Sequence, residues 1–129
     1  MADEITIKES LTYAGKESSE GALPFSITEK TYSVDQTGKD YTKGTQSIGT
    51  SSAEAIAVSA DIGTQGLWII HNRNANTGVL KLGISGNTAA EMLVKVEPGD
   101  PPARFRANAA VYAIASGAVV NIEFTCFEK

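Results

Sequence analysis

The second half of the chain is a succession of short apolar segments separated by turn-forming residues. These segments cover residues 67–70, 79–84, 92–96, 111–114 and 119–124, and Gly, Asn, Pro or Ser stands between each one and the next. A segment recurs roughly every 8 to 14 residues, which is typical of antiparallel sandwiches and closed sheets. The pattern therefore predicts an all-β fold, a single antiparallel β-sandwich. It leaves no visible place for a catalytic pocket, so the function is expected to lie in surfaces.

Length and composition limit the chain to one core. A chain of 129 residues buries about two thirds of the surface that its unfolded form exposes, so a second independent core would not fit. Apolar residues make up 42% and charged residues 20%, which is ordinary for globular proteins. The net charge is −4, and no run of Lys or Arg could follow a phosphate backbone, so we expect no nucleic-acid partner.

The beginning of the chain carries no sign of export. Residues 1–4 provide neither the cationic segment nor the apolar stretch of a secretion signal. No apolar run approaches the roughly 20 residues that span a bilayer, so no membrane partner is expected. We therefore expect the protein to be made in a cytoplasm and to stay there unless something larger carries it out.

Alternation predicts a first strand near the N-terminus. Ile5 and Ile7 alternate with polar residues, and Leu11 and Tyr13 continue the same odd-numbered parity before Gly15 ends it. We expect residues 1–15 to form an extended N-terminal edge strand or arm. Residues 16–129 would form the sandwich domain.

The second strand is expected to change face along its length. Phe25 and Ile27 share odd parity, whereas Tyr32 and Val34 share even parity, so a bulge or corner is predicted around residues 28–31. Residues 35–40 have the composition of a hairpin loop, and 41–48 would return as a Thr-rich strand.

Three later segments carry further local signals. Residues 51–58 combine a capping box with strand-like alternation; we favour a strand, with a helix as the alternative. The Asn-rich residues 72–78 have the composition of a hairpin connection. Pro98 and Gly99 suit the two central positions of a type II turn.

Candidate chemical sites are few. His71 is the sole histidine, which removes a two-histidine metal site and makes a turn role more probable than catalysis. Cys126 is the sole cysteine and is predicted to be a small buried residue rather than a reactive thiol. Trp68 could be a carbohydrate platform, but its apolar neighbours favour the core. We therefore predict a protein without enzymatic activity, metal or cofactor.

Two arginines and the first strand make up the predicted partner interface. Arg104 and Arg106 lie two residues apart, on the same face of a strand, which suits contact with an acidic partner; a solvated edge is the alternative. An edge strand can also add to a partner's sheet. The candidate interface residues are Ile5, Ile7, Leu11, Tyr13, Arg104 and Arg106.

The order of the turns carries a resemblance to a known group. The turns and strands follow one another in this order: Gly49-Thr50, the corner at residues 61–66, the apolar strand ending at His71-Asn72, the turn at residues 98–100 and the closing strand from Val119. In this order and composition the chain, over residues 44–128, resembles small virion proteins of tailed bacteriophages. Two departures stand out: Asn74-Ala75-Asn76 lacks the Asp that is usual in this connection, and two prolines follow Asp100.

The resemblance implies a jelly-roll-like sandwich that sits on a phage particle. It implies a capsid decoration, or cement, protein that binds the outer head surface and bridges capsid subunits. Its partners would be the major capsid protein and further copies of itself, with a trimer favoured, and it would be found in the virion after assembly in the host cytoplasm. The alternative is a tail-associated or vertex structural protein, an adhesin with carbohydrate-binding capacity.

Overall fold

The computed structural model describes residues 5–13, 25–34, 40–84 and 94–129. The chain divides into two compact units, Met1–Gln36 and Thr37–Lys129. Every element in the described residues is a β-strand or a turn, so the predicted all-β class is confirmed. The predicted division into 1–15 and 16–129 remains a prediction; the boundary between the two compact units falls between Gln36 and Thr37.

The first unit contains a two-stranded antiparallel sheet. Strand β1 (Ile5–Tyr13) has the predicted extent, and it pairs with β2 (Phe25–Val34). Between Glu9 and Leu11 the register shifts, so that one residue of β1 stands opposite Thr28 and Glu29 of β2. This irregularity is the predicted bulge, and it lies within the segment where the parity of the sequence changes.

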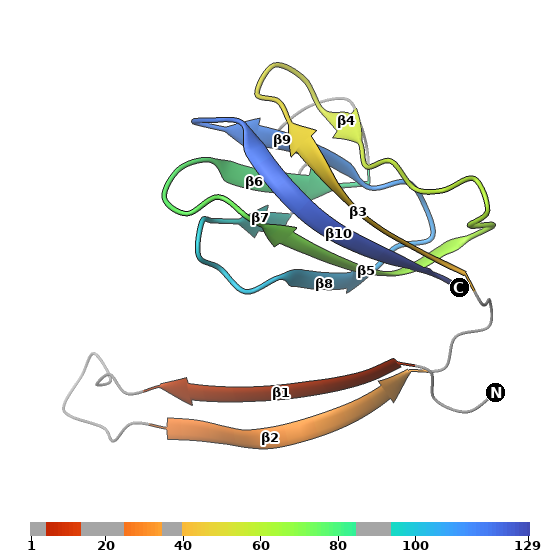
Figure 1. Ribbon diagram of the computed structural model, residues 1–129. Coiled ribbons are helices and arrows are strands. Elements are labelled where there is room, and N and C mark those ends of the chain that lie inside the picture. Colours follow the sequence, from red (N-terminus) through yellow and green to blue (C-terminus); the bar gives the residue numbers. More distant parts are fainter. Residues whose placement is uncertain (1–4, 14–24, 35–39, 85–93) are drawn as a thin grey trace. The chain divides into compact units, whose positions relative to one another are not determined.

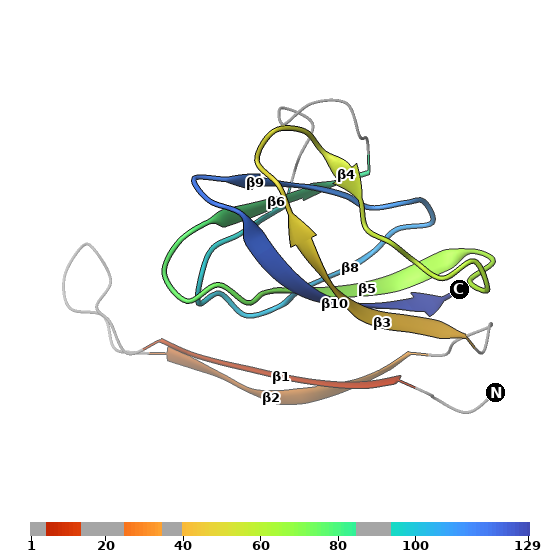
Figure 2. The ribbon, with the colours of Figure 1, turned by 45° about the horizontal axis from the view of Figure 1, so that its top comes forward.

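The second unit is a β-sandwich of two four-stranded antiparallel sheets (Figures 1 and 2). One sheet has the order β3-β10-β5-β8, formed by Tyr41–Ile48, Val120–Glu128, Gln65–Asn72 and Ala103–Arg106. The other has the order β4-β9-β6-β7, formed by Glu54–Ala55, Tyr112–Ser116, Val79–Gly83 and Val94–Val96. We refer to them as the β10 sheet and the β9 sheet.

Strict alternation along the strands builds the core between these sheets. In β10, Val120, Ile122, Phe124 and Cys126 are buried, and the residues between them face the other way. The β9 sheet contributes Leu80, Leu82, Val96, Ala113 and Ala115 to the same cluster. Because antiparallel sheets pack one face and leave the other toward solvent, each strand supplies one row to the core and one row to an outer face.

Two predicted connections are wrong. Residues 72–78 do not close a hairpin: β5 pairs with β10 and β8, whereas β6 pairs with β9 and β7, so this loop carries the chain from one sheet to the other. Strand β3 likewise pairs with β10 and not with β2. Loop composition indicates that the chain turns, but it does not choose the strand that the chain meets afterwards.

The other local predictions have clear outcomes. The ambiguous segment 51–58 holds the short strand β4 and no helix, so the favoured alternative is confirmed, although only over Glu54–Ala55. Pro98 and Gly99 form the expected turn: Gly99 has φ 88°, and the Glu97 N–H donates to the Asp100 carboxylate at 2.8 Å. Strand β7 begins at Val94, and the remainder of its predicted range lies outside the described residues.

The joints of the sandwich use the residues that carry the resemblance. At the corner 61–66, the Gly63 N–H donates to Glu128 Oε1 at 3.0 Å, and the Lys129 N–H donates to the Thr64 carbonyl at 2.8 Å. A Cβ on Gly66 would lie 3.0 Å from backbone atoms of Phe127 and Lys129. This corner therefore needs glycine because the end of β10 passes directly against it.

Candidate functional site

The outer face of the β10 sheet carries many polar and charged side chains of the sandwich. We call it the outer face; alternation and strand register place on it a mixture of polar, charged and apolar residues. Its members are Tyr41, Lys43, Thr45 and Ser47 of β3; Asn121, Glu123, Thr125 and Phe127 of β10; Leu67, Ile69, His71 and the adjoining Arg73 of β5; and Arg104 and Arg106 of β8.

The backbone on both sides of Arg73 is held by two asparagines. Asn72, only 1% exposed, donates through Nδ2 to the carbonyls of Gly78 at 3.0 Å and Val96 at 3.2 Å. Its Oδ1 accepts the N–H of Asn74 at 3.0 Å. Asn72 therefore ties the loop after β5 to strand β7 of the opposite sheet.

Asn74 completes the network toward β10. Its Nδ2 donates to the carbonyls of Thr77 and Val119, both at 2.8 Å, and its Oδ1 accepts the N–H of Asn121 at 3.1 Å. Arg73 itself donates its backbone N–H to the Asn121 carbonyl at 2.9 Å, and its side chain is exposed. The backbone is thus anchored before, at and after residue 73, which pre-organises the position from which the Arg73 side chain extends.

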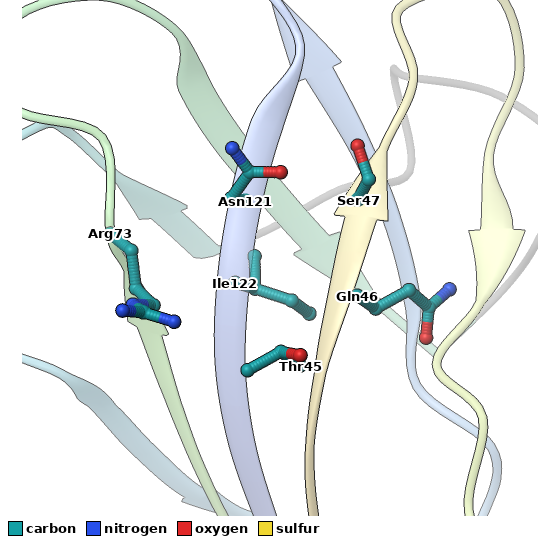
Figure 3. Close-up of a pocket in the computed structure, with 6 residues that line it drawn as sticks. All are labelled: Thr45, Gln46, Ser47, Arg73, Asn121 and Ile122. Carbon is teal, nitrogen blue, oxygen red and sulfur yellow. The ribbon is translucent and has the colours of Figure 1, made fainter.

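A shallow depression of about 290 Å³ lies at this end of the outer face. Figure 3 shows Arg73 on the β5 side and Thr45 and Ser47 on the β3 side, with Asn121 of β10 between them. Gln46 points away toward β4. There its Nε2 donates hydrogen bonds to Glu54 Oε1 and the Ala55 carbonyl, and its Oε1 accepts one from the Ala57 N–H. Gln46 therefore closes one side of the sandwich, and the guanidinium, amide and hydroxyl groups of the other residues are left for a ligand.

The middle and the far end of the outer face differ in character. Lys43 and Glu123 form an exposed ion pair at 3.8 Å, worth at most about 1 kcal/mol in water. Beyond them, the rings of Tyr41 and Phe127 lie 6.1 Å apart between centroids and are tilted by 38°. Tyr41 is 63% exposed. One end is therefore polar and hollowed, and the other presents an exposed aromatic ring.

The predicted interface residues fall in two places. Arg104 and Arg106 are exposed on β8, where they alternate with Ala103 and Phe105, which pack against the core, so the prediction that the two arginines share one face is confirmed. Ile5 and Ile7 lie on β1, whose pairing with β2 gives it a partner along one edge. Leu11 and Tyr13 stand opposite Ile27 and Phe25 in the register, and their side chains lie outside the described part of the chain. Whether these residues form an interface stays a prediction.

Sequence reasoning missed Arg73 and the residues around it. The sequence pattern places Arg73 in a hairpin connection, and the signal that marks it is a single charged residue between two asparagines in a loop of small residues. His71 is half-buried on the outer face, directly opposite Glu123 in the register, and not in a turn as expected. Both positions depend on β5 lying beside β10, a pairing of segments far apart in the chain.

The remaining candidates have structural roles. Trp68 is fully buried in the core, as favoured, and its Nε1 has no hydrogen-bond partner among the described residues. Cys126 is also buried, and desolvation raises the pKa of its thiol, an effect partly countered by a backbone hydrogen bond from Gly66. Within the described ranges, no three His, Cys, Asp or Glu side chains gather in a way that could hold a metal ion.

No helix in the described ranges is long and apolar enough to cross a membrane.

Searches against protein-family models, curated proteins and solved structures find no match to this chain.

Proposed function

We propose that the chain is a non-enzymatic virion protein of a tailed bacteriophage, a capsid decoration protein that binds the outer head surface and bridges capsid subunits. The observation that carries this proposal is the role of the motifs on which the resemblance depends. The 61–66 corner and the Asn-rich loop are joints of the sandwich, each bound to β10 or to the loop before it by specific hydrogen bonds, and the turn at residues 97–100 is closed by its own hydrogen bond. A shared order of these turns is therefore evidence for a shared fold.

We further propose that the sandwich is a jelly roll. Its eight strands support this, because consecutive strands pass between the two sheets at every step except β6 to β7. The two orders, β3-β10-β5-β8 and β4-β9-β6-β7, are what eight strands produce when a long antiparallel ribbon is rolled up. The likeness to virion proteins and the strand order thus point in the same direction.

A decoration protein must bind by its surface, and this chain offers two suitable features. The outer face of the β10 sheet carries exposed arginines and an aromatic ring. The separate β1–β2 sheet has one unpaired edge on each strand, and such edges can add to the sheet of a neighbour. Weak contacts of this kind, repeated over a lattice, are strengthened through effective concentration. Self-association as a trimer belongs to the same proposal.

Counting the copies of this chain in purified particles by quantitative mass spectrometry tests the proposal. A number comparable to that of the major capsid protein is expected for decoration of the head. A number comparable to that of tail or vertex proteins would replace decoration with the tail-associated alternative. Absence from the particles would refute both.

One observation favours the second candidate, a tail-associated or vertex adhesin that binds carbohydrate. The depression beside Arg73 combines donors and acceptors of a kind that bind sugar hydroxyl or carboxylate groups. The wild type and Arg73→Ala are each titrated with neutral and acidic oligosaccharides in a calorimeter. Saturable heats of binding are expected only for the wild type. No heat with any sugar removes this candidate.

A further inference from the structure

One strand of the sandwich has a long edge that pairs with no other strand. In the part of the chain that the structure describes, the outermost strands are β3 and β8 of the β10 sheet and β4 and β7 of the β9 sheet. Strands β4, β7 and β8 have two, three and four residues, and Pro101 and Pro102 precede β8. Short strands and prolines protect an edge from further pairing. Strand β3 has eight residues, Tyr41–Ile48, so it presents the one long edge of the described sandwich.

The ladder with β10 determines which backbone groups of β3 point outward. Asn121 accepts the Arg73 N–H through its carbonyl and donates its own N–H to Asn74, so both of its groups point toward β5. Residues of an antiparallel ladder alternate, so the even-numbered residues of β10 bond to β3, as the Glu128 N–H does to the Asp40 carbonyl at 2.9 Å. Their partners are the even-numbered residues of β3. The outward N–H and carbonyl groups of β3 are therefore those of Tyr41, Lys43, Thr45 and Ser47.

The side of the sandwich is closed without these outward groups. The side chains of Thr42 and Gln46, in the even-numbered row, bond to the backbone of the segment 55–59. The Lys43 side chain extends toward β10, where its Nζ lies 3.8 Å from Glu123 Oε1. Within the described ranges, no backbone hydrogen bond outside the ladder with β10 involves β3. An edge of this kind can accept a further strand.

A second copy of β3 fits this edge. When two copies run antiparallel about a two-fold axis at Gly44, every outward residue meets another outward residue: Tyr41 stands opposite Ser47, and Lys43 stands opposite Thr45. Each of these pairs can exchange about two hydrogen bonds. The two lysines do not face one another, as they would if the axis passed through Lys43. At the axis the two strands meet in a non-hydrogen-bonded pair, where side chains come closest, and glycine has none there.

We propose that β3 joins two copies of the chain edge to edge, so that their two four-stranded β10 sheets become one continuous sheet. Tyr41 of the second copy, which is 63% exposed in the single chain, then stands beside Ser47 at the rim of the depression. Each depression thus gains an aromatic ring from the other copy. The inference goes beyond the proposed function, because it rests on β3 alone and joins copies in pairs, whereas the trimer rests on the resemblance.

Light scattering on the full-length protein over a concentration series tests the pairing. A contact of one strand is small beside a standard interface, so we expect a dimer that forms as the concentration rises, or a hexamer if the copies also form trimers. Thr45→Pro removes an outward N–H from each copy and leaves the ladder to β10 intact, so association should weaken at least about tenfold. Thr45→Val keeps that N–H and should associate like the wild type. Circular dichroism and thermal unfolding verify that both variants fold.

The double variant Tyr41→Cys/Ser47→Cys tests the register. In one copy about 20 Å of strand separates the two positions, too far for a disulfide, whereas across the axis each lies directly opposite the other. Mild oxidation should therefore link the double variant into a covalent dimer. Tyr41→Cys alone and Ser47→Cys alone should stay unlinked, since the native Cys126 is buried.

Each other outcome overturns a stated part. A monomer at every concentration, or a trimer that pairs no further, shows that the edge of β3 does not join copies. Association that survives Thr45→Pro places the contact elsewhere on the molecule and overturns the proposal. A double variant that associates but does not cross-link contradicts the register about Gly44. These results are independent of the copy number in purified particles, so the inference and the proposed function fail separately.

Discussion

Replacing Asn72 with alanine tests whether the asparagine network holds the two sheets and Arg73 in place. Asn72 is the one polar side chain among the described residues that is buried with the core, at 1% exposure. The substitution removes two donated bonds, to Gly78 and Val96, and one accepted bond, from Asn74. Two carbonyls and one N–H then lose their partners at a joint that water reaches poorly.

The magnitude follows from the number of bonds. Each intramolecular hydrogen bond contributes a net of about 1 kcal/mol, so Asn72→Ala should lower the free energy of unfolding by about 3 kcal/mol. The vacated volume adds to this cost. For a domain of this size, 1 kcal/mol corresponds to about 4–8 °C, so the unfolding midpoint should fall by roughly 10–25 °C. Asn72→Asp should cost more than alanine, because its carboxylate would face the carbonyls of Gly78 and Val96 without a proton to donate.

Urea unfolding followed by Trp68 fluorescence supplies the measurement, with an unchanged denaturant slope showing that the same surface unfolds. The matched control is Asn76→Ala in the same loop. Asn76 is exposed, and its side chain makes no hydrogen bond to any described residue, so the free energy of unfolding should change by no more than about 0.5 kcal/mol. If Asn72→Ala costs no more than Asn76→Ala, the network is not what joins the sheets, and the argument that Arg73 is pre-organised loses its basis.

Three further predictions concern single residues of the sandwich. Gly78→Ala should destabilise the fold by at least about 1–3 kcal/mol more than Gly117→Ala. Both glycines have positive φ (86° and 84°), but a Cβ on Gly78 would lie 2.8 Å from Val120 Cγ2, whereas nothing lies within 4 Å of a Cβ on Gly117. Equal losses of stability in urea unfolding would contradict this crowding. The Cys126 thiol should react slowly with a disulfide reagent until the protein is denatured, because burial raises its pKa. The folded state favours the protonated thiol, so the stability that the raised pKa contributes is complete below the ordinary thiol pKa and is lost as pH rises above it. Cys126→Ala should therefore flatten the alkaline fall in stability, and an unchanged slope would refute the linkage. Trp68 fluorescence should be poorly quenched by acrylamide and unaffected by sugars, as expected for a fully buried indole; efficient quenching of the folded protein would show that the ring is exposed.

Much of the sandwich could be predicted because its signals are local. Alternation in β10 separates Ile122 and Phe124 from Asn121 and Glu123 without reference to any other strand. The parity change between Ile27 and Tyr32 is likewise readable within ten residues, and it marks the bulge. The turn at Pro98 and Gly99 depends only on the φ values that these two residues favour.

The candidate site could be predicted only in part. Arg104 and Arg106 share a face because they are two residues apart on a strand, which is a local property. Their grouping with Arg73 depends on β5 pairing with β8 on one side and β10 on the other, and no local pattern encodes that choice. The loop at residues 72–78 shows the same limit: its composition indicates a turn whether the next strand joins the same sheet or the opposite one.

The order of residues alone thus determined the strand class, the buried row of each strand and the positions of the turns, because side chains alternate with a period of two and turns depend on the φ preferences of single residues. Only the tertiary structure decided which strands are neighbours, and hence that three arginines and an aromatic ring share one face of an acidic chain. The physical reason is that strand pairing joins distant segments through backbone hydrogen bonds, which are chemically alike at every residue except proline. The choice among pairings therefore falls to the packing of the whole core and to a few specific joints such as Asn72.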